Sequence, residues 1–356
     1  MLKKTKTWVA LSIILQYALV KWLAQYPEWI EANYSTGFYL FISKILRYGL
    51  GWIPFSVGDL LYITAIVFGI RWLFKHRKRI WRDTKQWFID VFAVCAVVYF
   101  VFHVFWGLNY YRMPLHENLG INNQYTTEQL IEVTKTLIEK TNNIHFEITK
   151  NDTVKVVVYY RKGDILNKTQ KGYENLGHIF PDLEFQPASL KKSVFSYPLS
   201  YMGFSGYLNP FSGEAQVNSL IPLFKIPTTA SHEVAHQLGY AAENEANFIG
   251  CMAALNHDDI YFKYAGHTFG LGHCLNEIYR RDVILYNNLI LNINKGVLKN
   301  YEENRNFWKA HKNPMEPIFK RLYSNYLKAN NQDKGIESYS YVVALLVNYF
   351  TEDSFR

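Results

Sequence analysis

The sequence predicts an α+β protein in which about three transmembrane helices precede a mostly helical domain with a small mixed sheet. Apolar and aromatic runs of nearly membrane-spanning length fill the first 110 residues. From Tyr111 onward the pattern becomes that of a water-exposed globular domain, where helical signals outnumber short extended ones. We therefore expect a membrane anchor over residues 1–110 and a second domain over residues 111–356.

Three stretches approach the roughly 20 apolar residues that a helix needs to cross a bilayer. They lie near residues 7–26, 57–74 and 87–108, and the third is the most apolar. A cleaved signal peptide is the rival interpretation of the first, but bulky residues follow it where a cleavage site needs small ones, which favours an uncleaved anchor. Between the first two, Thr36–Pro54 is apolar and aromatic yet interrupted by charges, which predicts an amphipathic segment at the membrane interface.

The positive charge of the chain sits beside these apolar stretches. The formal net charge is +8, and residues 1–108 carry 13 Lys/Arg against 5 Asp/Glu, which accounts for all of it. We therefore expect a lipid bilayer, and no nucleic acid, as the partner of this charge. Lysines precede the first stretch and basic residues join the second to the third, so three crossings would place everything after about residue 110 outside the cytoplasm. An even number of crossings would reverse this orientation.

The second part of the chain begins with alternating helical and extended patterns. Thr126–Thr141 predicts a helix opened by a capping box with Gln129. Val154–Tyr160 is a β-branched and aromatic run and predicts a strand. A helix is expected over Leu166–Ile179, and a turn followed by an extended segment over Gly203–Asn218.

The chemistry is concentrated in His232-Glu233-Val234-Ala235-His236. On a helix, histidines four residues apart project from one face and can bind one zinc ion. Glu233 then lies where a general base would take a proton from water activated by the metal. Two incidental histidines on a helix surface are the competing interpretation, and a chance match has a probability on the order of one per cent.

The flanking residues favour a short helix around this motif. Thr228, Thr229 and Ser231 are N-cap candidates, and Gly239 stands where a helix would end. A catalytic zinc site needs a third protein ligand and a vacant position for water. Glu243 is the first choice and Glu245 the alternative, because the turn between them and the motif cannot be derived from sequence. Asn247 is four residues after Glu243, so it is expected to hydrogen-bond a ligating histidine.

The motif with the downstream Glu243-x-x-Ala246-Asn247 resembles the zincin superfamily, specifically its glutamate-liganded branch. This resemblance implies a zincin-like domain in which a Glu-x-x-Ala-Asp segment supplies the third ligand. The chain departs from that branch in having Asn247 in place of Asp and a short gap between His236 and Glu243.

Nearly the whole chain is also similar to an uncharacterised bacterial membrane family, domain-of-unknown-function family 3810. The resemblance is carried by Asn109–Leu115, by Pro210–Ala215 and by the histidine motif continuing into Glu245–Phe248. It implies a bacterial membrane protein with a zinc-peptidase-like fold. Together with the orientation expected from the charges, this places a multi-pass protein in the bacterial inner membrane with its catalytic domain on the periplasmic face.

Weaker expectations concern substrate binding. In zincins an edge strand before the motif helix pairs with extended substrate, and Gly213–Asn218, with Gly213, Glu214 and Ala215 at its start, is in the right place. Gly206–Asn209, just before it, could equally be a mere surface hairpin. Tyr264, with Tyr261 and His267 nearby, is a candidate donor to the oxyanion, although ordinary packing is the commoner role for such residues.

The leading functional hypothesis is a membrane-anchored zinc metallopeptidase that hydrolyses peptide or protein substrates. An intramembrane protease would need the motif inside an apolar helix of about 20 residues, whereas charged residues surround this one. A non-catalytic zincin-fold sensor or scaffold with a structural or vestigial zinc site is the alternative from a different class. The intact Glu233 favours the enzyme, because a structural metal site needs no base beside it.

Overall fold

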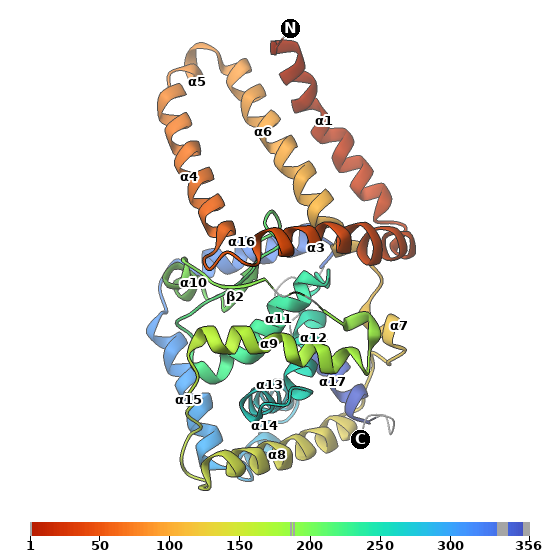
Figure 1. Ribbon diagram of the computed structural model, residues 1–356, viewed down its shortest axis with the longest axis vertical. Helices are drawn as coiled ribbons and strands as arrows, with labels where there is room; N and C mark the ends of the chain where they lie inside the picture. Colours follow the sequence, from red (N-terminus) through yellow and green to blue (C-terminus); the bar gives the residue numbers. More distant parts are fainter. Residues whose placement is uncertain (1, 186, 188, 333–340, 352–356) are drawn as a thin grey trace.

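Three long apolar helices project from one end of a helical body in the computed structural model, which describes residues 2–185, 187, 189–332 and 341–351 (Figure 1). They are α1 (Leu2–Leu23), α4 (Val57–His76) and α6 (Thr84–Phe105). The short α5 (Arg79–Arg82) joins α4 to α6 at the end remote from the body, where the N-terminus also lies (Figure 1). The molecule therefore has a helical stalk and a larger body.

Two of these helices, α4 and α6, are each long and apolar enough to cross a membrane. A third span results if α1 and the helices that follow it after a 98° bend are counted as one. The predicted spans near 57–74 and 87–108 agree with α4 and α6 within a few residues, and the one near 7–26 corresponds to α1, which starts earlier. These helices associate the chain with a membrane.

Two helices lie across the ends of the stalk, between it and the body (Figure 1). The first follows the bend as α2 (Pro27–Trp29), the π-helical segment η1 (Ile30–Phe38) and α3 (Tyr39–Leu50), and the second is α16 (Glu316–Ala329). In α3 the buried residues Tyr39, Ser43 and Arg47 are four apart, so one face packs on the body and the other stays exposed. This is the amphipathic pattern expected for Thr36–Pro54.

The core of the body is built around two consecutive helices, α11 (Ile226–Gln237) and α12 (Glu243–Leu255), which pack on each other. Around them pack α9 (Lys162–Gly177), α13 (Ile260–Arg281) and α17 (Val342–Thr351), and α8 (Thr127–Thr149) packs in turn on α13 and α17. The remaining elements of the described chain are η2 (Gly107–Tyr111), α7 (Leu115–Leu119), η3 (Pro181–Leu183), α10 (Ser196–Met202), η4 (Leu223–Lys225), α14 (Val283–Ile290) and α15 (Lys295–Ala310). The predicted capping box is present, with Thr126 and Gln129 exchanging side-chain and backbone hydrogen bonds.

A small mixed sheet lies beside α11, as expected. Its strands are β1 (Leu190–Lys192), β2 (Gly206–Leu208) and β3 (Ala215–Val217), with β3 in the middle, parallel to β1 and antiparallel to β2. The strand expected over Val154–Tyr160 is not part of it, and this prediction was wrong. The segment has alternating buried and exposed residues, but its backbone bonds to the Asn300 side chain instead of a neighbouring strand. The alternation of buried and exposed residues in this segment therefore results from burial of one side of the chain and not from pairing with another strand.

Residues from both sides of position 110 share one buried cluster at the junction of stalk and body. Ile30, Tyr34, Trp106, Ala241 and Leu327 belong to it. A second link is the ion pair between the Arg112 guanidinium and the Glu31 carboxylate, whose two hydrogen bonds measure 2.9 and 2.5 Å. The membrane-associated helices are thus packed directly against the elements that hold the chemical motif.

Candidate metal centre

The motif helix α11 begins earlier than its polar residues suggested. Pro227 occupies its first turn, where a missing N–H leaves no donor unsatisfied. The helix ends directly after the motif, and Gly239 follows in the left-handed region with φ +88°, as expected. The predicted N-cap role of Thr228, Thr229 and Ser231 was wrong, because all three lie inside the helix.

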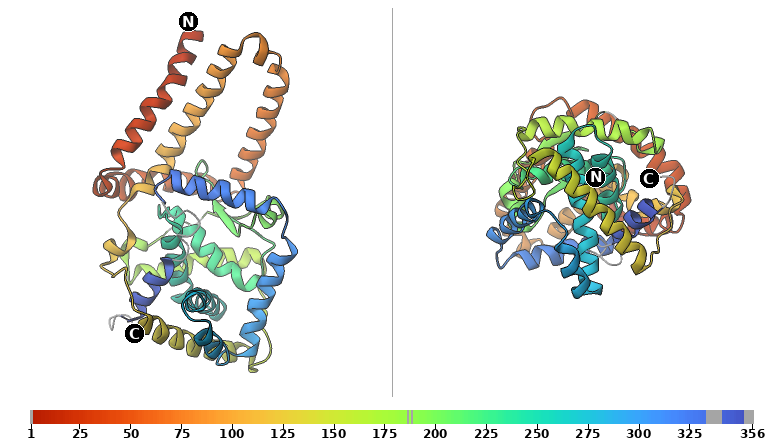
Figure 2. Two further views of the ribbon diagram at one scale, coloured as in Figure 1. Left: turned by 180° about the vertical axis from the view of Figure 1, so that it is seen from behind. Right: turned by 90° about the horizontal axis from the view of Figure 1, so that it is seen from below.

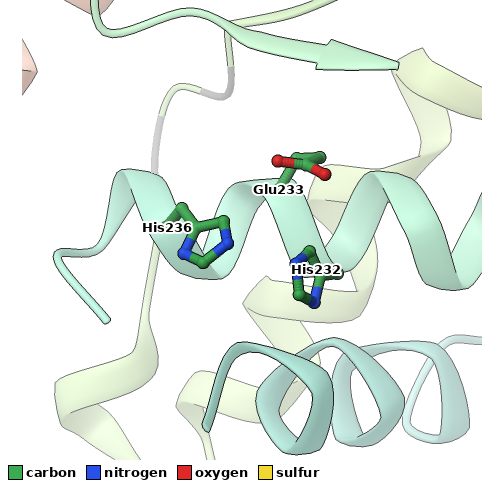
Figure 3. A group of neighbouring side chains, drawn as sticks. All are labelled: His232, Glu233 and His236. Atoms are coloured by element: carbon green, nitrogen blue, oxygen red, sulfur yellow. The ribbon is translucent and has the colours of Figure 1, made fainter. Parts of the chain in front are cut away.

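His232 and His236 project from one side of α11, and Glu233 lies next to them (Figure 3). The two imidazole rings are 4.7 Å apart between centroids. One potential ligand atom from each of the three residues falls within 4.8 Å of the others. The one-turn spacing therefore brings the motif together as the sequence predicted.

The carboxylate that approaches the two histidines belongs to Glu243, the first residue of α12. Its Oε2 atom lies 3.3 Å from His232 Nε2 and 3.7 Å from His236 Nε2. A tetrahedral ion with bonds of about 2.0–2.2 Å separates its ligand atoms by roughly 3.3–3.6 Å. Both distances are close to this range, so Glu243 is placed to serve with the two histidines as a ligand of a divalent metal ion.

Glu245 points elsewhere, because it lies on another side of α12. Its Oε1 atom accepts a hydrogen bond of 2.7 Å from the backbone N–H of Leu115, and the Arg112 charge is close. Burial raises the pKa of Glu245 to about 7 in spite of these two contacts. This carboxylate supports the start of α7 and does not face the histidines.

The surroundings of the site shift the pKa values of Glu233 and Glu243 in opposite directions. Burial is the main cause that raises the pKa of Glu233 to about 7. Burial acts in the same direction on Glu243, but hydrogen bonds and charges of His232 and His236 outweigh it, so the pKa of Glu243 lies well below its usual range. Near neutral pH, Glu243 is ionised and Glu233 can accept or release a proton.

Backbone and side-chain partners orient the ligands. The Nδ1 atom of His236 lies 2.7 Å from the carbonyl oxygen of Tyr240, which leaves Nε2 directed toward Glu243. Glu243 in turn accepts a 2.5 Å hydrogen bond at Oε1 from the Tyr323 hydroxyl of α16. The role predicted for Asn247 is not seen: its amide nitrogen is buried without a partner in the cavity wall.

Residues of α3 and the residue that follows α6 fix the end of α11. Tyr39 donates its hydroxyl to the carbonyl oxygens of His236 and Gln237, at 3.2 and 3.0 Å. The Trp106 indole N–H and the Ser43 hydroxyl reach the same two carbonyls, at 3.3 and 3.1 Å. The last helical carbonyls, which have no partner within the helix, are thus satisfied by residues of the membrane-associated part.

A cavity of about 900 Å³ opens in front of the motif. Its wall includes the three residues that fit a metal ion, the general-base candidate Glu233 and the whole of β2. Gly206 of β2 approaches Glu233 closely, since a Cβ atom at this position would lie 2.5 Å from Glu233 Oε1. The strand next to the motif is therefore β2, in the segment for which a surface hairpin was one of two open alternatives.

The substrate-binding expectations for Gly213, Glu214 and Ala215 need correction. Ala215 begins β3, the central strand, which has a neighbour on each side and no free edge for a substrate. Buried Glu214 accepts hydrogen bonds from the backbone N–H groups of Val57 and Gly58 at the start of α4. It joins stalk to body because a carboxylate is favoured at a helix N-terminus.

Tyr264 also lies away from the site. Its side chain is fully buried in the core, and its hydroxyl donates to Asn300 Oδ1 at 2.8 Å. The tyrosine beside the motif is Tyr323, which sequence reasoning missed. It is 80 residues from Glu243 in a helix with no local signal that links the two.

Comparison with known proteins yields one match. The family model described as "Protein of unknown function (DUF3810)" matches residues 34–347, which is most of the chain. No curated protein and no solved structure matches it.

Proposed function

We propose that this chain, which belongs to the DUF3810 family of proteins of unknown function, is a membrane-anchored zinc metallopeptidase with a zincin-like body. The observation that carries the proposal is the convergence of His232 Nε2, His236 Nε2 and Glu243 Oε2 next to Glu233, at the wall of a cavity of about 900 Å³. A purely structural ion would need neither a base beside it nor a cavity in front of it. This combination favours the enzyme over a sensor or scaffold.

His232, His236 and Glu243 would hold the ion. When bound, zinc supplies Lewis acidity that polarises the scissile carbonyl and lowers the pKa of water. Glu233 takes a proton from the attacking water, whose oxygen bonds to the carbonyl carbon. Glu233 then delivers that proton to the amine nitrogen as the C–N bond breaks, and its pKa of about 7 suits both transfers near neutral pH.

We further propose that the body lies on the periplasmic side of a bacterial inner membrane. Support comes from the position of the positive charge. The lysines at the start of α1 and the basic residues around α5 belong to the ends of the stalk that are remote from the body (Figure 1). Such charge is retained on the cytoplasmic side, so the body would lie on the other side if α1, α4 and α6 all cross.

Two measurements on the purified full chain test the function. Metal analysis should find one zinc per chain in the wild type and in Glu233→Gln, and none in His232→Ala. Cleavage of casein and of a peptide library should fall roughly 10²–10⁴-fold in Glu233→Gln, because the general base is lost. His116→Ala and Glu302→Gln, changed outside the cavity, serve as matched controls.

The outcomes separate the two classes of function. Zinc retained without any Glu233-dependent cleavage would favour the sensor or scaffold. Absence of zinc from the wild type, or its retention in His232→Ala at full occupancy, would contradict the metal site itself.

A further inference from the structure

Part of the wall of the cavity is made by the stalk. Tyr62 comes from α4 and Phe102 from α6, the two helices that can each cross a membrane, and both side chains line the cavity. The Tyr62 ring stacks on Tyr207 of β2 at 6.2 Å between centroids. Tyr207 directly follows Gly206, where an added Cβ atom would lie 2.5 Å from Glu233 Oε1. A continuous apolar wall therefore leads from a membrane helix to the proposed general base.

The level of the bilayer surface is marked by the two helices that lie across the stalk. One side of η1 and α3 exposes Phe38, Phe41, Ile45 and Tyr48, which are 51–64% accessible and three or four residues apart. Such an apolar stripe is typical of a helix that rests in the membrane interface.

The second of these helices, α16, carries a similar stripe. Met315, Ile318 and Leu322 follow at the same spacing and are 50–60% accessible. Tyr323 and Tyr326 of the same helix line the cavity. The helix α16 therefore carries an exposed apolar stripe and also contributes two tyrosines to the wall of the cavity.

The helices α4 and α6 lie further apart at the body than at α5 (Figures 1 and 2). Near α5 the two helices touch, with the rings of Trp72 and Trp87 at 5.8 Å between centroids. From there α4 and α6 diverge toward the body, as both side views show (Figures 1 and 2). Tyr62 near the start of α4 and Phe102 near the end of α6 both belong to the diverging parts, so each of the two helices contributes a cavity-lining side chain at its body end.

We propose that the substrate is an acylated peptide, whose acyl chain lies between α4 and α6 against Tyr62 and Phe102 while its peptide part runs along β2 to Glu233. This inference rests on the proposed peptidase function. A transmembrane helix is the other common membrane anchor, but at a diameter of 10–12 Å it occupies roughly 500 Å³ per turn. Two turns would fill the cavity of about 900 Å³, whereas an acyl chain is a single file of methylene groups.

The test uses the full chain with zinc in phospholipid vesicles and one internally quenched peptide in three forms. The peptide carries an N-terminal palmitoyl group, an N-terminal acetyl group or a single transmembrane helix. Wild type should cleave the palmitoyl form with a kcat/KM at least about tenfold above that of the acetyl form. Tyr62→Ala and Phe102→Ala should each reduce this preference roughly tenfold, because each removes apolar contact with the acyl chain.

Phe68→Ala on α4 and Phe100→Ala on α6 are the matched controls. Both side chains are more than half exposed and lie outside the cavity wall. Partition of the palmitoyl group into the vesicle raises the local substrate concentration for every variant alike. Loss of preference confined to Tyr62→Ala and Phe102→Ala therefore reports the proposed contact.

A binding measurement makes the test independent of turnover. In Glu233→Gln, a palmitoyl peptide with a diazirine in its acyl chain should label Tyr62 and Phe102. Labelling confined to Phe68 and Phe100, or none, would overturn the inference.

The cleavage results separate this inference from the function on which it rests. Equal, Glu233-dependent cleavage of the palmitoyl and acetyl forms would overturn the acyl site and leave the peptidase intact. Preferential cleavage of the peptide with a transmembrane helix would show that the substrate is held in the membrane by a helix and not by an acyl chain. A wild-type chain without zinc and without cleavage of any form would overturn the peptidase function, and the acyl inference with it.

Discussion

Substitution of Tyr323 by phenylalanine should weaken zinc binding without changing the fold. The hydroxyl of Tyr323 donates to Glu243 Oε1 at 2.5 Å, while Glu243 Oε2 faces the two histidines. The ring packs on Phe204 and Tyr326, at 5.0 and 6.0 Å between centroids, and phenylalanine preserves both contacts. The variant thus removes one hydrogen bond from the buried carboxylate that we propose as the third ligand.

The size of the effect follows from the charge of the acceptor. A hydrogen bond to a charged group contributes about 1.5–3 kcal/mol, and its loss leaves Glu243 free to turn away from the histidines. At about 1.4 kcal/mol for each factor of ten, the zinc Kd should rise roughly 10- to 150-fold. Partners that orient a metal ligand typically change metal affinity by about 10- to 100-fold, which is the same range.

Competition with a zinc chelator of known affinity measures this change, and the melting temperature of the metal-free chain checks the fold. Tyr326→Phe is the matched control. Tyr326 lies one turn further along α16. Its hydroxyl accepts a hydrogen bond of 3.2 Å from the Tyr110 hydroxyl and donates no hydrogen bond to Glu243. An unchanged zinc Kd in Tyr323→Phe, or an equal loss in both variants, would refute the reasoning that Tyr323 positions a metal ligand.

Three further changes have outcomes that follow from packing or charge. Gly206→Ala should abolish hydrolysis in an activity assay while zinc stays bound, because the added Cβ would lie 2.5 Å from Glu233 Oε1. Glu214→Gln should lower the melting temperature by several degrees, since the buried carboxylate accepts the Gly58 N–H at 2.5 Å and a charged acceptor contributes about 1.5–3 kcal/mol. Burial, with the charges of two lysines, lowers the pKa of His267 to about 4 in the folded chain. Because the unfolded chain takes up this proton more readily, the stability of the fold decreases as the pH falls from about 6.5 to about 4. His267→Gln should remove up to about 3 kcal/mol of that acid sensitivity, measured as melting temperature against pH.

Each of these changes has a control in the same protein. Gly163→Ala adds a methyl group where nothing lies within 4 Å and should leave hydrolysis unchanged. Glu302→Gln alters an exposed carboxylate and should not change the melting temperature. His116→Gln, at a half-buried histidine, should leave the acid sensitivity as it is. Full activity in Gly206→Ala, an unchanged melting temperature in Glu214→Gln or an unaltered pH profile in His267→Gln would contradict the respective argument.

The sequence alone determined the features that depend on neighbouring residues. The apolar runs that became α4 and α6 are properties of about 20 consecutive residues. The helix that carries His232, Glu233 and His236 follows from a four-residue spacing and from a glycine just beyond it. The capping box at Thr126 is equally local, since it involves residues three apart. In each case the relevant interactions form within one element, so the order of residues is enough to predict them.

Only the tertiary structure decided which side chains meet across elements. The turn between α11 and α12 directs Glu243, and not Glu245, toward the histidines. Tyr323 reaches Glu243 from a helix 80 residues later. The pairing of the strands puts β3 in the centre of the sheet, where an edge strand was expected, and leaves β2 beside the motif. Packing between elements distant in sequence sets these contacts, and local pattern contains no information on which distant surfaces will be buried together.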